Sequence, residues 1–390
     1  MNNQLNWNNL IAPTYASPKL KLVAGKGSYV YDETGKSYLD FLSGIAVTAL
    51  GHAHPVVAEA VALQVTKLGH VSNLFANPIA EVLADKLLVL AGMPGGRVFF
   101  CNSGAEANEA AIKYIRAYKP KSNMVAIEGG FHGRTIGALS VTGQPEKRAP
   151  FEPLMKKVEF IRLNDLGHVA KKITTRTGGV WLEMIQGEAG VIPLDPSFIS
   201  TIVNRSRSKI AALVIDEVQT GIGRTGSWFA FQGMDLKPDF VPIAKGLGGG
   251  LPIGALLISE PMAEMLKPGG HGTTFGGNPI AAAASLAVLE TISKERLIDN
   301  AIARGKELVE KISVLPQVAD VRGKGLLLGI VFDSDIAKQV ESAAMSNGLI
   351  VNAVRPNVIR LAPPLNVSVA EVNLAIELLN ASLLEVLNHE

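Results

Sequence analysis

The stretch PDFVPIAKGLGGGLPIGA, residues 238–255, indicates both the fold class and the kind of chemistry that we expect of this chain. An apolar run typical of a buried strand ends at Lys245, and a glycine-rich turn follows it. Open parallel sheets bind ligands beyond the carboxyl ends of their strands, so a lysine at this position is well placed for chemistry. Together with Asp216 upstream, Lys245 suggests a Schiff-base lysine and the acidic partner of a pyridine cofactor. A solvated loop lysine is the alternative that this stretch leaves open.

The chain around this stretch reads as an α/β protein. Strand-like and helix-like segments alternate from about residue 55 to 260, which predicts a mostly parallel sheet. We expect helices over 55–69 and 78–91, a strand over 97–100, and a helix from Ser103 to about Lys119. The pattern changes from about residue 280, where helices near 280–294, 300–314, 334–347 and 369–387 frame two β-like runs, VRGKGLLLGIVF and GLIVNAVRPNVIRLAPP. The expected organisation is an N-terminal arm or small-domain segment (1–50), a large domain (51–275) and a small α+β C-terminal domain (276–390).

Composition excludes several classes of protein. The 390 residues include 37 basic and 35 acidic side chains, a net charge of +2 that favours neither nucleic acid nor an anionic membrane as a partner. The weakly charged stretch 240–258 is a poor membrane span because it contains Lys245, two prolines and many glycines. Cys101 is the only cysteine, which rules out an internal disulfide and favours a reducing compartment. With a polar N-terminus that resembles no secretory signal, the expected location is the cytoplasm.

Polar residues follow several of the expected strands. Ser103 and Glu106 form a capping-box pattern, which leaves the backbone N–H groups of Ser103, Gly104 and Ala105 at a helix N-terminus. Such an end suits a phosphate group, although an ordinary capped helix fits the same residues. Further strand ends carry the segment FHGRT (131–135), the side chains of Glu183, Gln186 and Glu188, and Asp216. So many polar strand ends favour a binding site.

Three further features bear on this site. Asp216 and Lys245 are 29 residues apart, about one strand–connection–strand unit, so both side chains can face one crevice. The turn HGTTFGGNP (271–279) offers the hydroxyl groups of Thr273 and Thr274, or uses these residues only to form the turn. Arg360 is a single charge in an apolar run and needs an anionic partner. A structural carboxylate and a substrate carboxylate fit that need equally well.

Several other chemistries lack their motifs. The P-loop pattern fails because Val30 stands where its first glycine should be, and GLGGG does not match the register of a dinucleotide-binding loop. No H-E-x-x-H, paired C-x-x-C or G-x-S-x-G motif is present. His52 and His54 lack the further histidine or cysteine ligands that a metal site needs, so we expect no metal.

Seven motifs in one order carry a family resemblance. NSGAEANEA, FHGRT, QGEAG, VIDEVQTGIGRTG, AKGLGGGLPIGA, TTFGGNP and RLAPP follow one another along the chain. In this order they resemble the class III (subgroup II) aminotransferases, which are pyridoxal-phosphate enzymes of fold type I. The likeness runs from about residue 18 to the C-terminus. It implies a homodimer with shared active sites, one small-molecule amino donor, and 2-oxoglutarate as the acceptor.

The resemblance also implies roles for individual residues. Lys245 resembles the lysine that binds the cofactor covalently, and Asp216 resembles the partner of its pyridine nitrogen. The other positions that match the family's cofactor contacts are Ser103, Gly104 and Ala105 for the phosphate, Phe131 for stacking on the ring, Gln219 beside the ring hydroxyl, and Thr274 for the phosphate of the second subunit. The positions that match substrate contacts are Arg134, Thr273 and Arg360, with Glu188 as the carboxylate that can mask Arg360.

Within the class, the chain is most similar to the N-acetylornithine aminotransferases of arginine biosynthesis. Ile45 stands where ornithine aminotransferases typically carry a substrate-binding tyrosine, and KGLGGGLPIGA is similar to the acetylornithine enzymes. The alternatives are another class III enzyme acting on ornithine, succinyl-diaminopimelate or 4-aminobutyrate, an aminomutase, and a catalytically silent paralogue. Two departures from the family pattern are Met184, where proline is frequent, and Ala76, where tyrosine is common near the substrate entrance.

Overall fold

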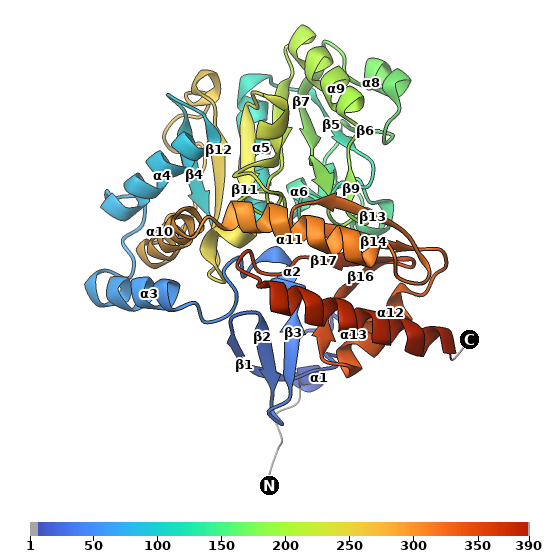
Figure 1. Ribbon diagram of the computed structural model, residues 1–390. Helices are drawn as coiled ribbons and strands as arrows, with labels where there is room; N and C mark the ends of the chain where they lie inside the picture. The colour runs from blue at the N-terminus through green and yellow to red at the C-terminus, as the bar shows by residue number, and fades with distance from the viewer. Residues whose placement is uncertain (1–6, 389–390) are drawn as a thin grey trace.

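The computed structural model describes residues 7–388, and its centre is a seven-stranded sheet (Figure 1). The strands follow the order β4-β12-β11-β10-β7-β5-β6. Their bounds are β4 Arg97–Cys101, β5 Asn123–Ile127, β6 Val158–Ile161, β7 Thr177–Leu182, β10 Ala212–Ile215, β11 Phe240–Ile243 and β12 Gly254–Ile258. From β11 to β6 all neighbours run parallel, whereas β12 is antiparallel to both β11 and β4. The α/β fold with a mostly parallel sheet is therefore confirmed.

The two faces of this sheet bury separate sets of side chains, as the alternation of a strand requires. In β5, Met124 and Ala126 pack with helix α5 (Gly104–Tyr118) on one face, while Val125 and Ile127 belong to the larger core on the other face. Helices α8 (Leu166–Lys172) and α9 (Pro196–Ser208) pack near β6 and β10. The sheet is thus covered on both sides, and this explains why its strands read as continuous apolar runs in the sequence.

Local signals explain where the main helices of this region begin and end. Helix α4 (Pro78–Ala91) starts with proline after Asn77, whose side chain accepts a hydrogen bond from Ile79 N–H, and it stops at Gly92 in the left-handed conformation. Helix α10 (Pro279–Lys294) repeats the Asn-Pro start. The remaining short helices are α1 Trp7–Leu10, α3 Pro55–Lys67, α6 Ile136–Val141 and α7 Pro145–Arg148.

The C-terminal part forms a second, antiparallel sheet covered by helices. Its strand order is β13-β14-β17-β16, with bounds Val318–Lys324, Leu327–Phe332, Val358–Leu361 and Asn352–Arg355 respectively. Its helices are α11 Leu297–Ile312, α12 Ala337–Ser346 and α13 Val369–Asn388. The N-terminal strands β1 (Leu22–Lys26), β2 (Tyr29–Asp32) and β3 (Ser37–Asp40) form a third sheet with β15 (Leu349–Ile350). Because β3 pairs in parallel with β15, the N-terminal strands join the C-terminal part of the chain (Figure 1).

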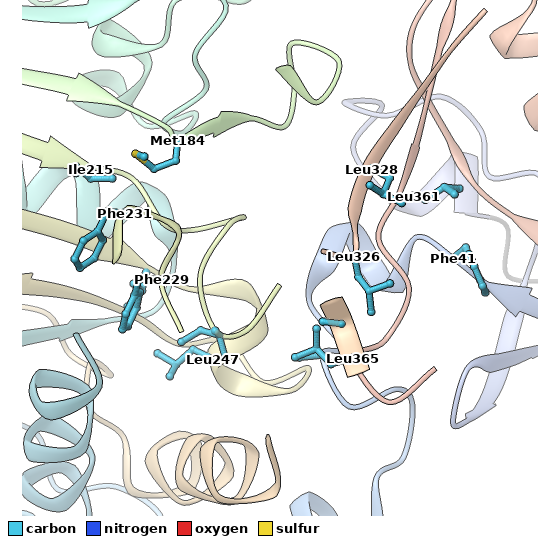
Figure 2. Packing of buried hydrophobic residues seen from close by; sticks show 14 of the residues in the cluster. Phe41, Met184, Ile215, Phe229, Phe231, Leu247, Leu326, Leu328, Leu361 and Leu365 are labelled. Carbon is cyan, nitrogen blue, oxygen red and sulfur yellow. The ribbon is translucent and has the colours of Figure 1, made fainter. Parts of the chain in front are cut away.

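One hydrophobic core joins these parts. Figure 2 shows Ile215, Phe229 and Phe231 on the side of the seven-stranded sheet, and Leu326, Leu328 and Leu361 on the side of the second sheet. Buried Arg224 connects the same two parts, because its Nη1 donates to the carbonyl oxygens of Leu326 and Pro363. The two parts are therefore held together by both hydrophobic packing and hydrogen bonds.

The structure differs from the sequence-based boundaries in a few places. The helix expected over 55–69 ends at Lys67, where Leu68 turns to an extended conformation. The run VRGKGLLLGIVF is two antiparallel strands, because Gly325 makes a left-handed turn in its middle. Residues 43–46, assigned as α2 (Ser43–Ala46), form a left-handed turn in which all four residues have positive φ. Such a turn is costly for Ile45, and strain of this kind is often found next to functional sites.

Candidate active site

A cavity of about 450 Å³ opens at the carboxyl ends of the parallel strands. Its walls include Lys245 after β11, Asp216 after β10, Glu183 and Glu188 after β7, and the segment 131–134 after β5. The N-terminus of α5 supplies Ser103, Gly104 and Ala105. This volume falls in the ordinary range for small-molecule sites, and the position is the one that a parallel sheet favours.

Hydrogen bonds hold both carboxyl oxygens of Asp216 in place. Its Oδ2 accepts a hydrogen bond from Asn108 Nδ2 at 2.8 Å and lies 2.8 Å from His132 Nδ1, while its Oδ1 accepts from Val218 N–H at 3.0 Å. Burial alone would lower the pKa of His132, but the hydrogen bond and charge of Asp216, with Glu183, outweigh it and raise that pKa. Asp216 is thus a fixed side chain that faces the cavity beside a buried imidazole whose pKa is raised.

Lys245 brings an amine to the same cavity. It begins a 3₁₀ turn, η3 (Lys245–Gly248), with φ of +44°, an uncommon conformation for a lysine. Burial, aided by the charge of Arg360, lowers the pKa of Lys245 to about 8 despite the nearby carboxylates of Glu188, Glu183 and Asp216. A large fraction of this amine is therefore neutral near pH 8, as a nucleophile or a general base requires.

The N-terminus of α5 presents backbone N–H groups to the cavity. Ser103 caps the helix, accepting at its Oγ from Glu106 N–H at 3.2 Å. The first N–H groups of a helix have no partner in earlier turns, and together with the helix dipole they favour an anion. A Cβ atom at Gly104 would lie 2.7 Å from the Val218 side chain, so only glycine allows this end to approach the turn after Asp216.

An ion pair borders the cavity on the side of the second sheet. Arg360 on β17 is 1% exposed, and its Nη1 donates to Glu188 Oε1 at 2.5 Å and to Gln219 Oε1 at 3.2 Å. Its Nη2 donates to Asn352 Oδ1 at 2.8 Å. Glu188 and Gln219 line the cavity, whereas Arg360 lies behind them. Although burial opposes ionisation of Glu188, the charge and hydrogen bond of Arg360 hold its pKa below the usual value.

Phe131 and Arg134 form another part of the cavity wall. The guanidinium carbon of Arg134 lies 5.6 Å from the centre of the Phe131 ring, within the range of a cation–π contact. Arg134 is exposed on its outer side. The aromatic face and the exposed guanidinium thus sit together at the opening.

The two predicted threonines lie apart from the other residues. Thr273 Oγ1 accepts from Asn102 Nδ2 at 3.2 Å, and Asn102 lines the cavity, so Thr273 stands behind that wall. Thr274 is exposed and does not line the cavity of its own chain. Ala76 is likewise exposed on a loop, whereas Met184 is buried against Ile215 and Phe231 (Figure 2). The proline position of the family pattern is here filled by a core residue.

Two residues hold Asp216: Asn108, which had no predicted role, and His132, which the sequence placed at a strand end suited to ligand binding without indicating this contact. Asn108 is buried on α5 and also accepts from Trp181 Nε1 at 3.1 Å, and His132 is buried between the sheet and the cavity. The signal for Asn108 was a polar residue on an otherwise small, apolar helix face. The signal for His132 was its place between Phe131 and Arg134, two positions already assigned to the site.

A second fully buried carboxyl group, that of Glu217, follows Asp216 but points away from the cavity. It accepts hydrogen bonds from Phe231 N–H at 2.9 Å and from Thr220 Oγ1 at 2.5 Å. Burial is the main cause that raises the pKa of Glu217 from its ordinary value to about 7. The protonated form therefore stabilises the fold, and this contribution is complete below pH about 4.5 and is lost as the pH rises to about 7.

Replacing Glu217 with glutamine is expected to remove this pH dependence. Glutamine keeps the shape and an acceptor for Phe231 N–H, but it does not ionise. The free energy of unfolding of the wild type should fall by about 2 kcal/mol relative to Glu217→Gln between pH 5 and 7.5. Melting temperatures of both holoenzymes across this range measure the effect. A constant difference between the two proteins would contradict it.

The part of the chain that the structure describes contains neither a candidate metal site nor a membrane-spanning helix. Within residues 7–388, no group of three or more histidine, cysteine, aspartate or glutamate side chains is placed to hold a metal ion. None of the helices in the same range combines the length and the hydropathy needed to cross a bilayer.

Comparison with known proteins agrees with the geometry of the cavity. The model of the family "Aminotransferase class-III" matches residues 10–383. An acetylornithine aminotransferase from Streptomyces coelicolor is 50% identical over 363 residues, covering 92% of this chain and 90% of the relative. The N-acetylornithine aminotransferase of Stenotrophomonas maltophilia has a solved structure with 33% identity and a TM-score of 0.84, covering 96% of this chain and 98% of that one.

A structure of the ornithine aminotransferase from Toxoplasma gondii, which has partial occupancy of pyridoxal phosphate at its active site, is also similar. It shares 30% identity with a TM-score of 0.93, over 98% of this chain and 94% of that one. The family match spans nearly the whole chain, and the alignments cover 90% of the Streptomyces relative and 98% of the Stenotrophomonas structure. This chain therefore belongs to the class III aminotransferases, enzymes that depend on pyridoxal phosphate.

Proposed function

We propose that this aminotransferase moves the δ-amino group of N-acetylornithine to 2-oxoglutarate, giving N-acetylglutamate semialdehyde and glutamate in arginine biosynthesis. The observation that carries the proposal is a cavity where the Lys245 amine, the Asp216 carboxylate and the Glu188–Arg360 pair meet. The choice of donor is supported by relatives named as acetylornithine aminotransferases at 45–50% identity. It is also supported by Ile45, which takes the place of the tyrosine typical of ornithine enzymes.

The residues of the cavity fit pyridoxal phosphate. Its phosphate would bind the N–H groups of Ser103, Gly104 and Ala105, and the glycine leaves room for that approach. Phe131 would contact the face of the ring, Gln219 would lie near the ring hydroxyl, and Asp216 near the ring nitrogen. When bound, the cofactor supplies a carbonyl carbon that condenses with amines and a ring that takes up the charge left by proton removal.

Side chains of the protein would then transfer protons and hold the cofactor in its orientation. Lys245 would hold the cofactor between turnovers and, once released, move a proton to and from the reacting carbon, a role that suits a pKa of about 8. The Asp216 carboxylate, fixed by Asn108 and His132, would keep the ring nitrogen protonated because an opposite charge favours the charged form. Burial of the Asp216–His132 pair excludes water from this contact.

The Glu188–Arg360 pair offers a way to accept two substrates of different charge. With 2-oxoglutarate bound, Arg360 would form a forked pair with the carboxylate next to the reacting carbon, once Glu188 moves aside. With an amino donor that lacks this carboxylate, Glu188 would remain on Arg360 as it does in the structure. Arg134 at the opening would bind the carboxylate of the amino donor, and Thr273 would lie near the bound substrate.

We also propose a homodimer that completes the site. The loop around residues 73–77 is tied to the glycine-rich turn, since Asn73 Nδ2 donates to the Gly276 carbonyl at 3.0 Å. Large apolar side chains are exposed here, at Leu74, Phe75 and Phe275. Exposed apolar patches of this kind mark protein interfaces. In such a dimer, Thr274 would reach the phosphate of the partner subunit.

The single cysteine, Cys101, agrees with a cytoplasmic location.

A scan of amino donors tests the proposed substrate. Single-turnover rates are measured for N-acetylornithine, ornithine, 4-aminobutyrate and succinyl-diaminopimelate, followed by glutamate formation from 2-oxoglutarate. We expect N-acetylornithine to have the highest kcat/KM, with succinyl-diaminopimelate as a weaker substrate. A higher kcat/KM for ornithine or 4-aminobutyrate would refute the assignment, and turnover without glutamate formation would favour an aminomutase.

Replacing Arg360 with alanine should separate the two half-reactions. Loss of a forked ion pair is expected to slow the 2-oxoglutarate half-reaction about 100-fold and the amino-donor half-reaction less than about 5-fold. Since the single variant leaves the Glu188 carboxylate unpaired, the neutral double variant Arg360→Met, Glu188→Gln serves as a folding control. Rapid-mixing measurements of each half-reaction decide the point, and equal losses in both would contradict the division of labour.

A further inference from the structure

Lys147 places a second cation near the Phe131 ring, which lines the cavity together with Arg134. Lys147 lies on the short helix α7 (Pro145–Arg148), and its Nζ is 5.4 Å from the centre of the Phe131 ring. The Arg134 guanidinium lies 5.6 Å from the same ring centre. No sequence pattern singles out Lys147. It lies twenty residues after the end of β5 and belongs to none of the seven motifs.

Within the described chain, neither cation has a carboxylate partner that neutralises it. No ion pair is formed by Lys147 or Arg134 among residues 7–388, and the hydrogen-bond acceptor of Lys147 is the neutral Gln144 side chain. The Gln144 amide is itself fixed, since its Nε2 donates to the Gly129 carbonyl at 2.8 Å. The closest candidate anion inside the cavity, Glu188, is already paired with Arg360.

The electrostatics agree with a site that lacks an anion. Burial is the main cause that lowers the pKa of Lys147, and Arg134 and Arg355 lower it further, while Glu188 and Glu146 only partly oppose them. A half-buried amine next to a guanidinium is unfavourable unless an anion joins them. An incoming carboxylate would relieve this repulsion and raise the pKa of Lys147 again.

We propose that Lys147 and Arg134 together bind the carboxylate of the amino donor above the Phe131 ring, and that Lys147 is a specificity-determining residue. The inference rests on the proposed function, because it takes the donor to be an amino acid whose carboxylate is remote from the reacting amine. Arg134 supplies a planar fork and Lys147 a point charge on the other side of the carboxylate. The pair selects donors that carry this carboxylate over simple amines.

The test compares each donor with its counterpart that lacks the carboxylate. The variants are Lys147→Met, Lys147→Arg, and Lys156→Met as a matched control at an exposed lysine of the following loop. For N-acetylornithine, Lys147→Met is expected to lower kcat/KM about 10-fold, mainly through KM, as loss of one charge-assisted hydrogen bond implies. For N-acetylputrescine, which has the same amine without the carboxylate, kcat/KM should stay within about 2-fold. Lys147→Arg should restore most of the loss, and Lys156→Met should change neither substrate.

The outcomes separate this inference from the proposed function. Equal losses for both amines in Lys147→Met would show that Lys147 merely supports Phe131, and no loss for either would show that it does not face the donor. Either result overturns the inference. If the wild type does not use N-acetylornithine, the proposed function fails first, and the same comparison is made with the best donor of the scan and its decarboxylated counterpart.

Discussion

Replacing Lys245 with alanine is expected to lower the rate of transamination by at least about 10⁴-fold, because the variant loses both a nucleophile and a general base. No other amine of the cavity wall can replace it, since Lys245 is the only lysine among the described residues that line the cavity. Binding of the cofactor should persist through the phosphate, Asp216 and Phe131, although more weakly. The geometry therefore predicts a protein that binds pyridoxal phosphate reversibly and hardly turns over.

Three measurements check this expectation. The first is the rate of glutamate formation with saturating donor and acceptor. The second is borohydride reduction followed by peptide mapping, which should fix the cofactor on Lys245 in the wild type and leave none attached in the variant. The third is a control at Lys209, a lysine on the far side of the sheet at the end of α9, where alanine should leave both results unchanged. Near wild-type turnover by Lys245→Ala would refute the central role of this lysine.

Replacing Asp216 with asparagine is expected to lower kcat by about 10²–10³-fold, the usual effect of removing one preorganised charge contact. Asparagine keeps the size of the side chain, but the carboxylate that would keep the ring nitrogen protonated is gone. His132 also loses the charge and hydrogen bond that raise its pKa, so the pKa of His132 should fall. The effect on the free energy of unfolding should be small by comparison, because Val218 N–H keeps the amide oxygen as its acceptor and Asn108 Nδ2 keeps the carbonyl oxygens of Gly104 and His132.

The matched control for this prediction is the adjacent residue. Glu217 is as deeply buried as Asp216, but it bonds to Phe231 and Thr220 on the other side of the turn. Glu217→Gln should therefore change the pH dependence of stability and leave kcat near the wild-type value. Steady-state kinetics of both variants, with the His132 pKa followed by NMR, separate a local charge effect from general damage to the turn. Similar kcat values in the two variants would contradict the role of Asp216.

Several elements of the fold followed from local patterns alone. Helices α4 and α10 begin where Asn-Pro predicts a start, and α5 begins at its capping box. The strands of the large sheet were visible as short apolar runs because both of their faces are buried. The run from Val321 to Phe332 was correctly read as β-like, and the structure adds that a left-handed turn at Gly325 folds it into a hairpin of two strands.

The residues of the candidate site also fall into two groups, those that local patterns predict and those whose roles depend on tertiary contacts. Lys245, Asp216 and the α5 N-terminus were predictable because each stands at the end of an element whose direction the sequence reveals, and parallel strands bring such ends to one edge. Asn108, His132 and Lys147 were not, because their roles depend on contacts between residues 16 to 108 positions apart. No local pattern encodes a distance of that kind.

The sequence by itself determined that this chain has a parallel-sheet domain, a lysine and an aspartate at neighbouring strand ends, and the ordered motifs of its family. Only the tertiary structure decided how these groups are tuned. It buries Lys245 next to Arg360, joins Asp216 to His132 and Asn108, and places Glu188 on Arg360. The physical reason is that the pKa and the pairing of a charge depend on its solvation and its neighbours in space, which the order of residues along the chain does not specify.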